Sequence, residues 1–153
     1  MFDKLNRLFS SDGSSDSDDT ATARRSQLAA TALLLELCRA DQKIEDSELQ
    51  AIIAIARNTF DLSQDEADAL LDKAAEKNQL AVSLYEFTDT INRQCEKMEK
   101  IELIENMWRV ALADQSIDRH EEHLIRKVAD LIYVGHSDFI RAKHRVSSEI
   151  TGD

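Results

Sequence analysis

Six carboxylates stand at matching positions in two short segments of the sequence. Residues 40–48 read ADQKIEDSE, and residues 113–121 read ADQSIDRHE, 73 residues further along the chain. The carboxylates are Asp41, Glu45 and Glu48 in the first segment and Asp114, Asp118 and Glu121 in the second. Carboxylates with loop carbonyls bind hard divalent cations such as Ca²⁺ and Mg²⁺. We predict a divalent-cation site in the second segment, where Ser116 stands in place of Lys43. The first segment is predicted to be either a weaker metal site or one in which Lys43 supplies the positive charge.

Helix capping explains part of this pattern without a metal. An acid at the N-cap and a Glu three residues later satisfy free backbone N–H groups, which describes the last two carboxylates of each segment. It does not explain Asp41 and Asp114, which fall at the C-terminal end of a predicted helix, where the helix dipole disfavours an acid. A bound cation would compensate for this unfavourable interaction between the acid and the helix dipole. The spacing is not that of an EF-hand, which needs a Gly and a longer loop.

The elements that position these segments are predicted to be helices. The 153 residues include three glycines and no proline, which excludes Rossmann folds and P-loops. Apolar residues recur every three or four positions, as in amphipathic helices. We predict an all-α fold, a compact bundle of about seven helices with a pseudo-repeat of two helical hairpins. The helices are expected near residues 23–40, 46–60, 63–77, 83–91, 96–113, 118–134 and 137–150.

Local signals mark several helix ends and the core. Ser63 with Glu66 and Ser83 with Glu86 are typical of capping boxes. Gly135 is placed to be a left-handed C-cap. Apolar stripes predict which side chains are buried: Leu28, Leu35, Cys38, Leu49, Ile52, Ile53, Met98, Ile101, Ile104, Trp108 and Leu112.

The N-terminal part of the chain differs from the rest in composition. Residues 1–9 form a short amphipathic segment, with Phe2, Leu5 and Leu8 at helical spacing. Residues 10–22 are rich in Ser and Asp and predict a flexible acidic linker, so the helical domain is expected over 23–153. The segment could dock on the domain, on a partner helix or on a membrane surface. Its small apolar area and low positive charge disfavour the membrane.

Charge and cysteine content restrict the partners and the compartment. Thirty acidic against 19 basic residues give a net charge of −11, which disfavours nucleic-acid binding. The two cysteines are too few for a disulfide framework and predict reduced thiols in the cytoplasm. No apolar run is long enough to span a membrane.

Two further groups of side chains have both a functional and an ordinary interpretation. His120 and His123 lie beside the second acidic segment, but their spacing is not that of an HExxH zinc site, and histidines on an exposed helix are commoner. The last predicted helix carries Arg141, Lys143 and Arg145, with His144. This basic group either faces solvent and pairs with acids elsewhere or binds an anionic partner.

At the acidic segments the chain resembles the TerB-like (tellurite-resistance protein B-like) helical family. The resemblance covers about residues 23–150 and rests on A-D-x-x-I-x-x-x-E at 40–48 and 113–121, with LYEFTDTIN at 84–92. It implies a compact seven-helix domain with a pseudo-repeated acidic loop proposed to bind a divalent metal, calcium among the candidates. It also implies an association with tellurite resistance and stress responses.

These observations together favour a binding module over an enzyme. We expect a non-enzymatic cytoplasmic domain that binds a divalent cation, with no other cofactor, and that interacts with a protein partner in stress or envelope-linked processes. The alternatives are a metal-free protein–protein adaptor and a metal-dependent hydrolase. The hydrolase is disfavoured because it would need a base or nucleophile of tuned pKa beside the metal, and in the sequence only His120 and His123 are candidates.

Overall fold

The computed structural model of the chain describes residues 16–39, 46–80, 84–113 and 119–151. This part of the chain forms seven helices and no strand, as the all-α prediction requires. The helices are α2 (Asp16–Arg39), α3 (Asp46–Phe60), α4 (Gln64–Leu80), α5 (Tyr85–Gln94), α6 (Lys97–Ala111), α7 (Arg119–Leu131) and α8 (His136–Thr151). None of these helices combines the length and apolar character needed to cross a bilayer.

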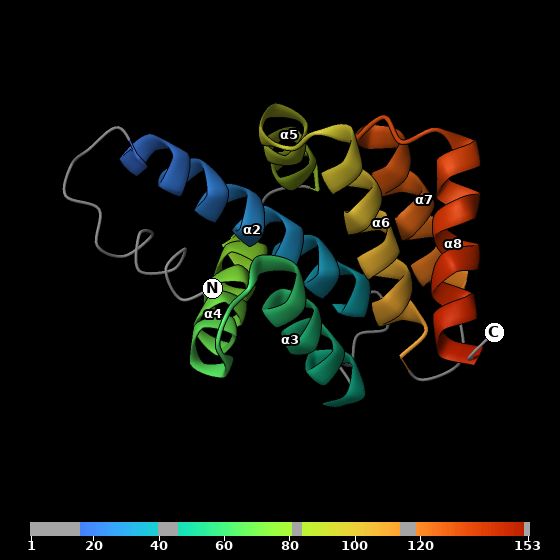
Figure 1. Ribbon diagram of the computed structural model, residues 1–153, viewed down its shortest axis with the longest axis horizontal. Coiled ribbons are helices and arrows are strands. Elements are labelled where there is room, and N and C mark those ends of the chain that lie inside the picture. The colour runs from blue at the N-terminus through green and yellow to red at the C-terminus, as the bar shows by residue number, and fades with distance from the viewer. Residues whose placement is uncertain (1–15, 40–45, 81–83, 114–118, 152–153) are drawn as a thin grey trace.

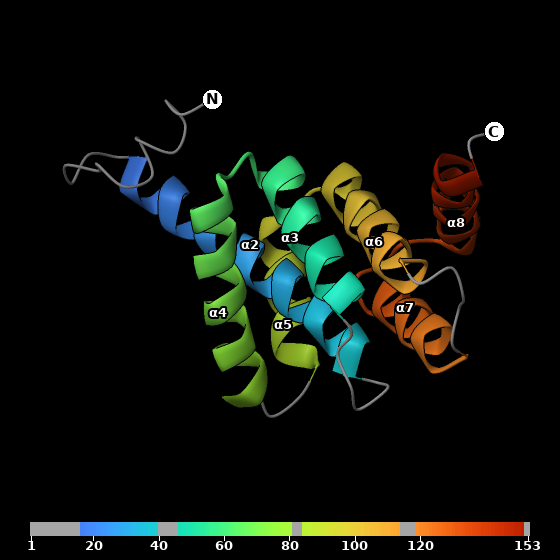
Figure 2. The ribbon, with the colours of Figure 1, turned by 90° about the horizontal axis from the view of Figure 1, so that it is seen from below.

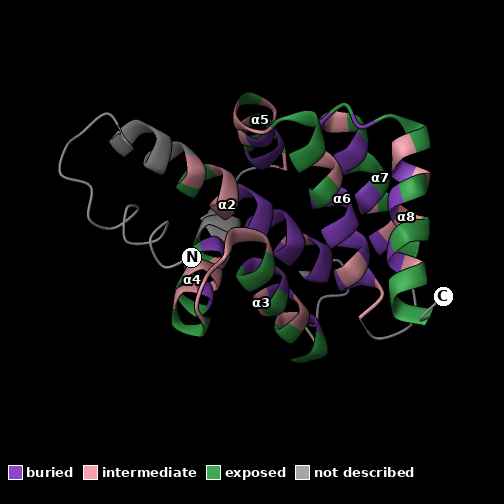
Figure 3. Cartoon of the chain, viewed as in Figure 1, coloured by how far each residue is buried: buried purple, intermediate pink, exposed green. Residues whose placement is uncertain are grey.

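Helix α2 is the central element of the bundle. It packs against α3, α4, α5, α6 and α7, and it runs between α5 on one side and α3 and α4 on the other (Figures 1 and 2). Its second half reads AATALLLELC, and all but one of these ten residues are buried (Figure 3). A helix that is apolar on nearly all sides is stable only when neighbours surround it, which explains its central place.

The seven helices form two similar units of three, with α5 between them. The first unit is α2–α3–α4 and the second is α6–α7–α8; in each, the first and third helices pack extensively against each other. Helices α3 and α7 begin 73 residues apart, and α4 and α8 begin 72 residues apart. The pseudo-repeat indicated by the acidic segments therefore extends to a third helix in each unit.

The second helix of each unit also ends in the same way. Asp61 follows α3 with φ 60°, and Tyr133 follows α7 with φ 63°. The next backbone N–H donates to a carbonyl five residues back, from Leu62 to Arg57 at 3.1 Å and from Val134 to Ala129 at 2.8 Å. This is the Schellman motif, in which a left-handed residue closes the helix. The prediction that Gly135 is the left-handed C-cap was wrong: Tyr133 has that role.

Two predicted helix starts differ from the structure. Helix α2 begins at Asp16 and so includes residues 16–22 of the predicted linker. No Gly or Pro interrupts 16–39, and adding a turn to an existing helix is easier than starting one. Helix α5 begins at Tyr85, with Leu84 as its N-cap, and the capping box predicted from Ser83 involves a residue outside the described ranges. The Ser63–Glu66 box is confirmed: each residue's backbone N–H donates to the other's side chain, at 2.9 and 3.2 Å.

The predicted core is confirmed at its centre and wrong at its edges. Leu35, Cys38, Ile52, Ile104 and Trp108 are buried, and the ring of Trp108 packs against that of Phe139 at 5.4 Å between centroids. The other predicted positions, Leu28, Leu49, Ile53, Ile101 and Leu112, are only partly buried. Met98 is 78% exposed, because the apolar stripe of α6 meets the core only from the following turn onward.

Candidate functional site at the starts of α3 and α7

Two equivalent glutamates of the acidic segments are buried. Glu48 is the third residue of α3, and Glu121 is the third residue of α7. Glu48 is 3% exposed and Glu121 is 2% exposed. Both have interaction partners in the folded chain, so neither is an isolated charge. The positive end of the helix dipole also favours a carboxylate in the first turn.

Burial separates these two glutamates from the ordinary helix caps of the same chain. Glu66 in α4 and Glu99 in α6 occupy the same third position, and each accepts a hydrogen bond from the backbone N–H of its N-cap residue, at 2.9 and 2.8 Å. Yet Glu66 is only half-buried and Glu99 is exposed. Capping alone therefore does not require the burial of Glu48 and Glu121, and burying a carboxylate is costly unless opposite charge or hydrogen bonds compensate.

The structure describes two of the six predicted metal ligands. Asp41, Glu45, Asp114 and Asp118 lie outside the described residues, as do Lys43 and Ser116. Helices α2 and α6, which precede the two acidic segments, pack against each other, and their C-terminal ends lie on the same side of the molecule (Figure 1). Over the described ranges, no three His, Cys, Asp or Glu side chains form a group that could hold a metal ion. His120 and His123 are both exposed on α7.

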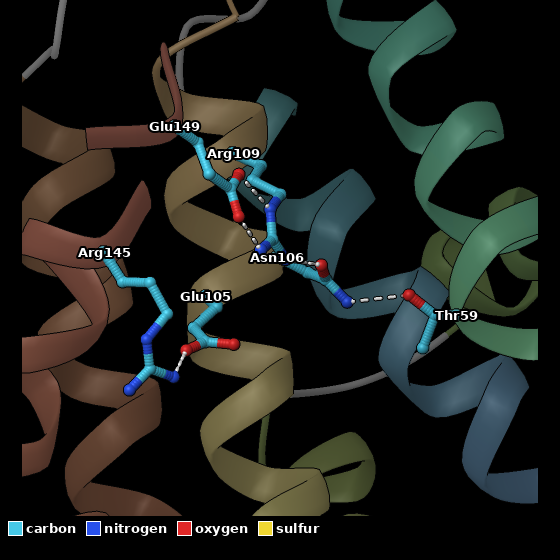
Figure 4. Close-up of polar contacts among 6 residues, drawn as sticks. All are labelled: Thr59, Glu105, Asn106, Arg109, Arg145 and Glu149. Carbon is cyan, nitrogen blue, oxygen red and sulfur yellow. Dashed lines mark hydrogen bonds and ion pairs between the residues drawn. The ribbon is translucent and has the colours of Figure 1, made fainter. Parts of the chain in front are cut away.

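A polar network that the sequence did not predict joins α3, α6 and α8 (Figure 4). The Asn106 amide donates to the hydroxyl of Thr59 at 3.1 Å and accepts from the Arg109 guanidinium at 2.6 Å. Arg109 also donates two hydrogen bonds to Glu149, at 2.6 and 3.0 Å. This paired contact lowers the pKa of Glu149 and raises that of Arg109. The signal in the sequence was a polar pair, Glu105 and Asn106, between the apolar residues Ile104 and Met107 of α6.

The basic residues of α8 pair mainly with acids of this chain. Arg145 donates to the buried Glu105 of α6, and Lys143 lies 3.6 Å from Glu122 of α7. Arg141 lies 3.9 Å from Asp138, one turn earlier in α8. These contacts favour the interpretation of the basic group as a solvated helix face over that of an anion-binding surface.

Comparison with known proteins agrees with the all-helical fold. A protein-family model described as "Tellurite resistance protein TerB" matches residues 27–144, which cover most of α2 and continue into α8. No curated protein and no solved structure matches the chain. The family match spans more than half of the sequence and includes both acidic segments, so the chain belongs to the TerB family.

Proposed function

We propose that this TerB domain is a non-enzymatic binding module whose two acidic segments bind a divalent cation, Ca²⁺ or Mg²⁺. The observation that carries the proposal is the burial of Glu48 and Glu121 at equivalent helix starts. Both segments bury a carboxylate at the same position, although such burial is costly. Its occurrence in both segments favours a shared function.

The chemistry of the residues fits a hard cation. Each segment offers three carboxylates, and Asp41 and Asp114 follow helices whose C-terminal ends carry partial negative charge. A cation at that point would neutralise both the carboxylates and the helix end. Three carboxylates supply too few ligand atoms without carbonyls and water, so the affinity should be modest.

The cation would act on binding to other proteins and not on catalysis. A hydrolase needs a base of tuned pKa next to the metal, and the nearby candidates, His120 and His123, are exposed side chains on α7. We propose that the metal-bound segments bind a protein partner in the cytoplasm. The family description suggests tellurite resistance as the process, and a stress or envelope-linked process is a related proposal.

Titration with CaCl₂ and MgCl₂, followed by amide NMR of the full chain, tests the metal site. We expect saturable shifts at residues 114–121, lost in Asp114→Ala and in Glu121→Gln. Glu99→Gln is the matched control, because Glu99 has the same third position in α6 but lies outside the two acidic segments. The shifts should persist in this variant. Shifts at 41–48 should need more metal, because Lys43 opposes binding there.

Two results would contradict the metal site. One is the absence of any shift at millimolar Ca²⁺ and Mg²⁺. The other is a wild-type response that persists in both Asp114→Ala and Glu121→Gln. Thermal unfolding of each variant shows whether it is folded. Either result would make the segments structural caps and would favour the metal-free adaptor.

A further inference from the structure

A groove between α2 and α4 exposes leucine side chains to solvent. It encloses about 430 Å³, within the range of about 300–1,000 Å³ typical of ligand-binding clefts. Leu28 of α2, Leu62 before α4 and Leu70 of α4 line it, and each is only partly buried. We call this site the α2–α4 groove.

The corresponding face of the second unit is different. Counted from the starts of α4 and α8, Leu70 matches Ala142, and Ala69, which also lines the groove, matches Arg141. Ion pairs join α6 and α8 there: Lys97 lies 3.8 Å from Asp138, and Arg145 pairs with Glu105. Asp138 matches Glu66 and Arg145 matches Lys73, so these positions are charged in both units, and in the second unit they form ion pairs that join α8 to α6. The concave apolar surface that the leucines form in the first unit marks a binding site.

The first nine residues of the chain, which lie outside the described residues, have the matching pattern. They read MFDKLNRLF, and on a helix Phe2, Leu5 and Leu8 fall on one side. Lys4 falls at the edge of that side, and Arg7 falls opposite it. The groove rim carries Asp65, with which Lys4 can pair. The lining also includes Arg24, Arg25 and Lys73, so segment and groove match in apolar area and not in net charge.

The chain is long enough for the segment to reach its own groove. The groove lines α2 from Arg24 to Leu28, eight to twelve residues after the helix begins at Asp16. At a rise of 1.5 Å per residue this is about 12–18 Å along the helix. The six residues 10–15 can span up to about 20 Å when extended. The connection therefore permits residues 1–9 to fold back alongside α2.

We propose that residues 1–9 bind the α2–α4 groove of the same chain as a short helix. Leu5 and its apolar neighbours would pack against Leu28, Leu62 and Leu70. A helix of nine residues is unstable alone in water, so the groove supplies the packing that it needs. The proposal does not depend on metal binding, because the groove shares no residue with the acidic segments.

Amide NMR of the full chain with two matched substitutions tests this docking. Leu5→Asp and Arg7→Gln each lower the net charge by one, but they lie on opposite sides of the predicted helix. We expect Leu5→Asp to shift the amides of Leu28, Leu62 and Leu70, and Arg7→Gln to leave them in place. From the other side of the contact, Leu70→Asp should shift the amides of residues 1–9, with the signals of α6–α8 unchanged as evidence that the domain is folded.

Three outcomes would overturn the proposal. Groove amides that do not respond to Leu5→Asp would show that the segment does not touch the groove. Shifts that grow with protein concentration, with a doubled mass in solution, would assign the groove to the segment of a second copy. Binding of residues 1–9 to phosphatidylglycerol vesicles, with groove signals that Leu5→Asp leaves unchanged, would assign the segment to a membrane surface.

Discussion

At the scale of single residues, buried polar contacts join α6 to α3 and α8. Glu105 and Asn106 are buried in a helix whose neighbouring positions are apolar, and their partners come from α8 and α3. The apolar periodicity of α6 cannot predict these partners, because Arg145, the partner of Glu105, lies 40 residues later in the chain. The sequence could predict that α6 packs in the core but not which acid it would bury.

Replacing Glu149 by Gln should weaken the fold at neutral pH and not at acid pH. Arg109 holds the pKa of Glu149 below its ordinary value, so the charged pair adds stability above about pH 4.3, the pKa of an unfolded Glu. This stability is lost as the pH falls through the lower pKa of the folded state. Both side chains are partly exposed, so we expect a loss of about 0.2–1 kcal/mol at pH 7.

Urea unfolding at pH 7 and pH 3 measures this difference. Glu76→Gln makes the same change of charge on the exposed surface of α4 and should leave the stability within about 0.5 kcal/mol of the wild type. An equal loss in Glu149→Gln at both pH values would show that the contribution of Glu149 is not its charge.

At the scale of elements, the helices were predictable and some of their ends were not. Helix α3 begins and ends at the predicted residues, because an apolar stripe and an acidic first turn mark it clearly. The end of α7 is set by packing: Val134 and Ala129 must both be buried, so the residue before Val134 takes the left-handed turn. That residue is Tyr133, and a rule that looks for Gly misses it.

Replacing Tyr133 by Gly should stabilise the domain. A left-handed backbone costs a residue with a Cβ about 1–2 kcal/mol, and Gly avoids most of that strain. Tyr133 is 82% exposed, so little packing is lost. We expect a gain of about 1 kcal/mol, seen as a higher midpoint in thermal unfolding. Tyr133→Ala keeps the Cβ and should bring no such gain; equal stabilisation by both substitutions would rule out relief of backbone strain.

At the scale of the whole molecule, the repeat was visible in the sequence only as two nonapeptides. The structure extends it to two units of three helices, since matching helix starts and matching Schellman ends recur with nearly the same spacing. The candidate site could be predicted in outline, because acidic residues at helix starts are a local signal. The burial of Glu48 and Glu121 could not, because it depends on how the units pack.

The two thiols should report the opening of the whole molecule separately from local motion. Cys38 is fully buried near the C-terminal end of α2, whereas Cys95 is half-buried, and burial raises the pKa of its thiol. In native buffer we expect a thiol reagent to modify Cys95 slowly and Cys38 only on global unfolding. In Cys95→Ser, labelling measured by mass should then follow the free energy of unfolding as urea is added. Rapid native labelling of that variant would mean that α2 separates from its neighbours without unfolding.

Helix α2 extends from the α2–α4 groove to the first acidic segment. Its 24 residues form one uninterrupted helix of about 36 Å, with the α2–α4 groove along its first half and the acidic segment of α3 beyond its last turn. Side chains surround its second half on nearly all sides, so a bend there would expose core residues. This packing fixes the distance between the groove and the point at which α2 ends and the first acidic segment begins, although the two surfaces share no residue.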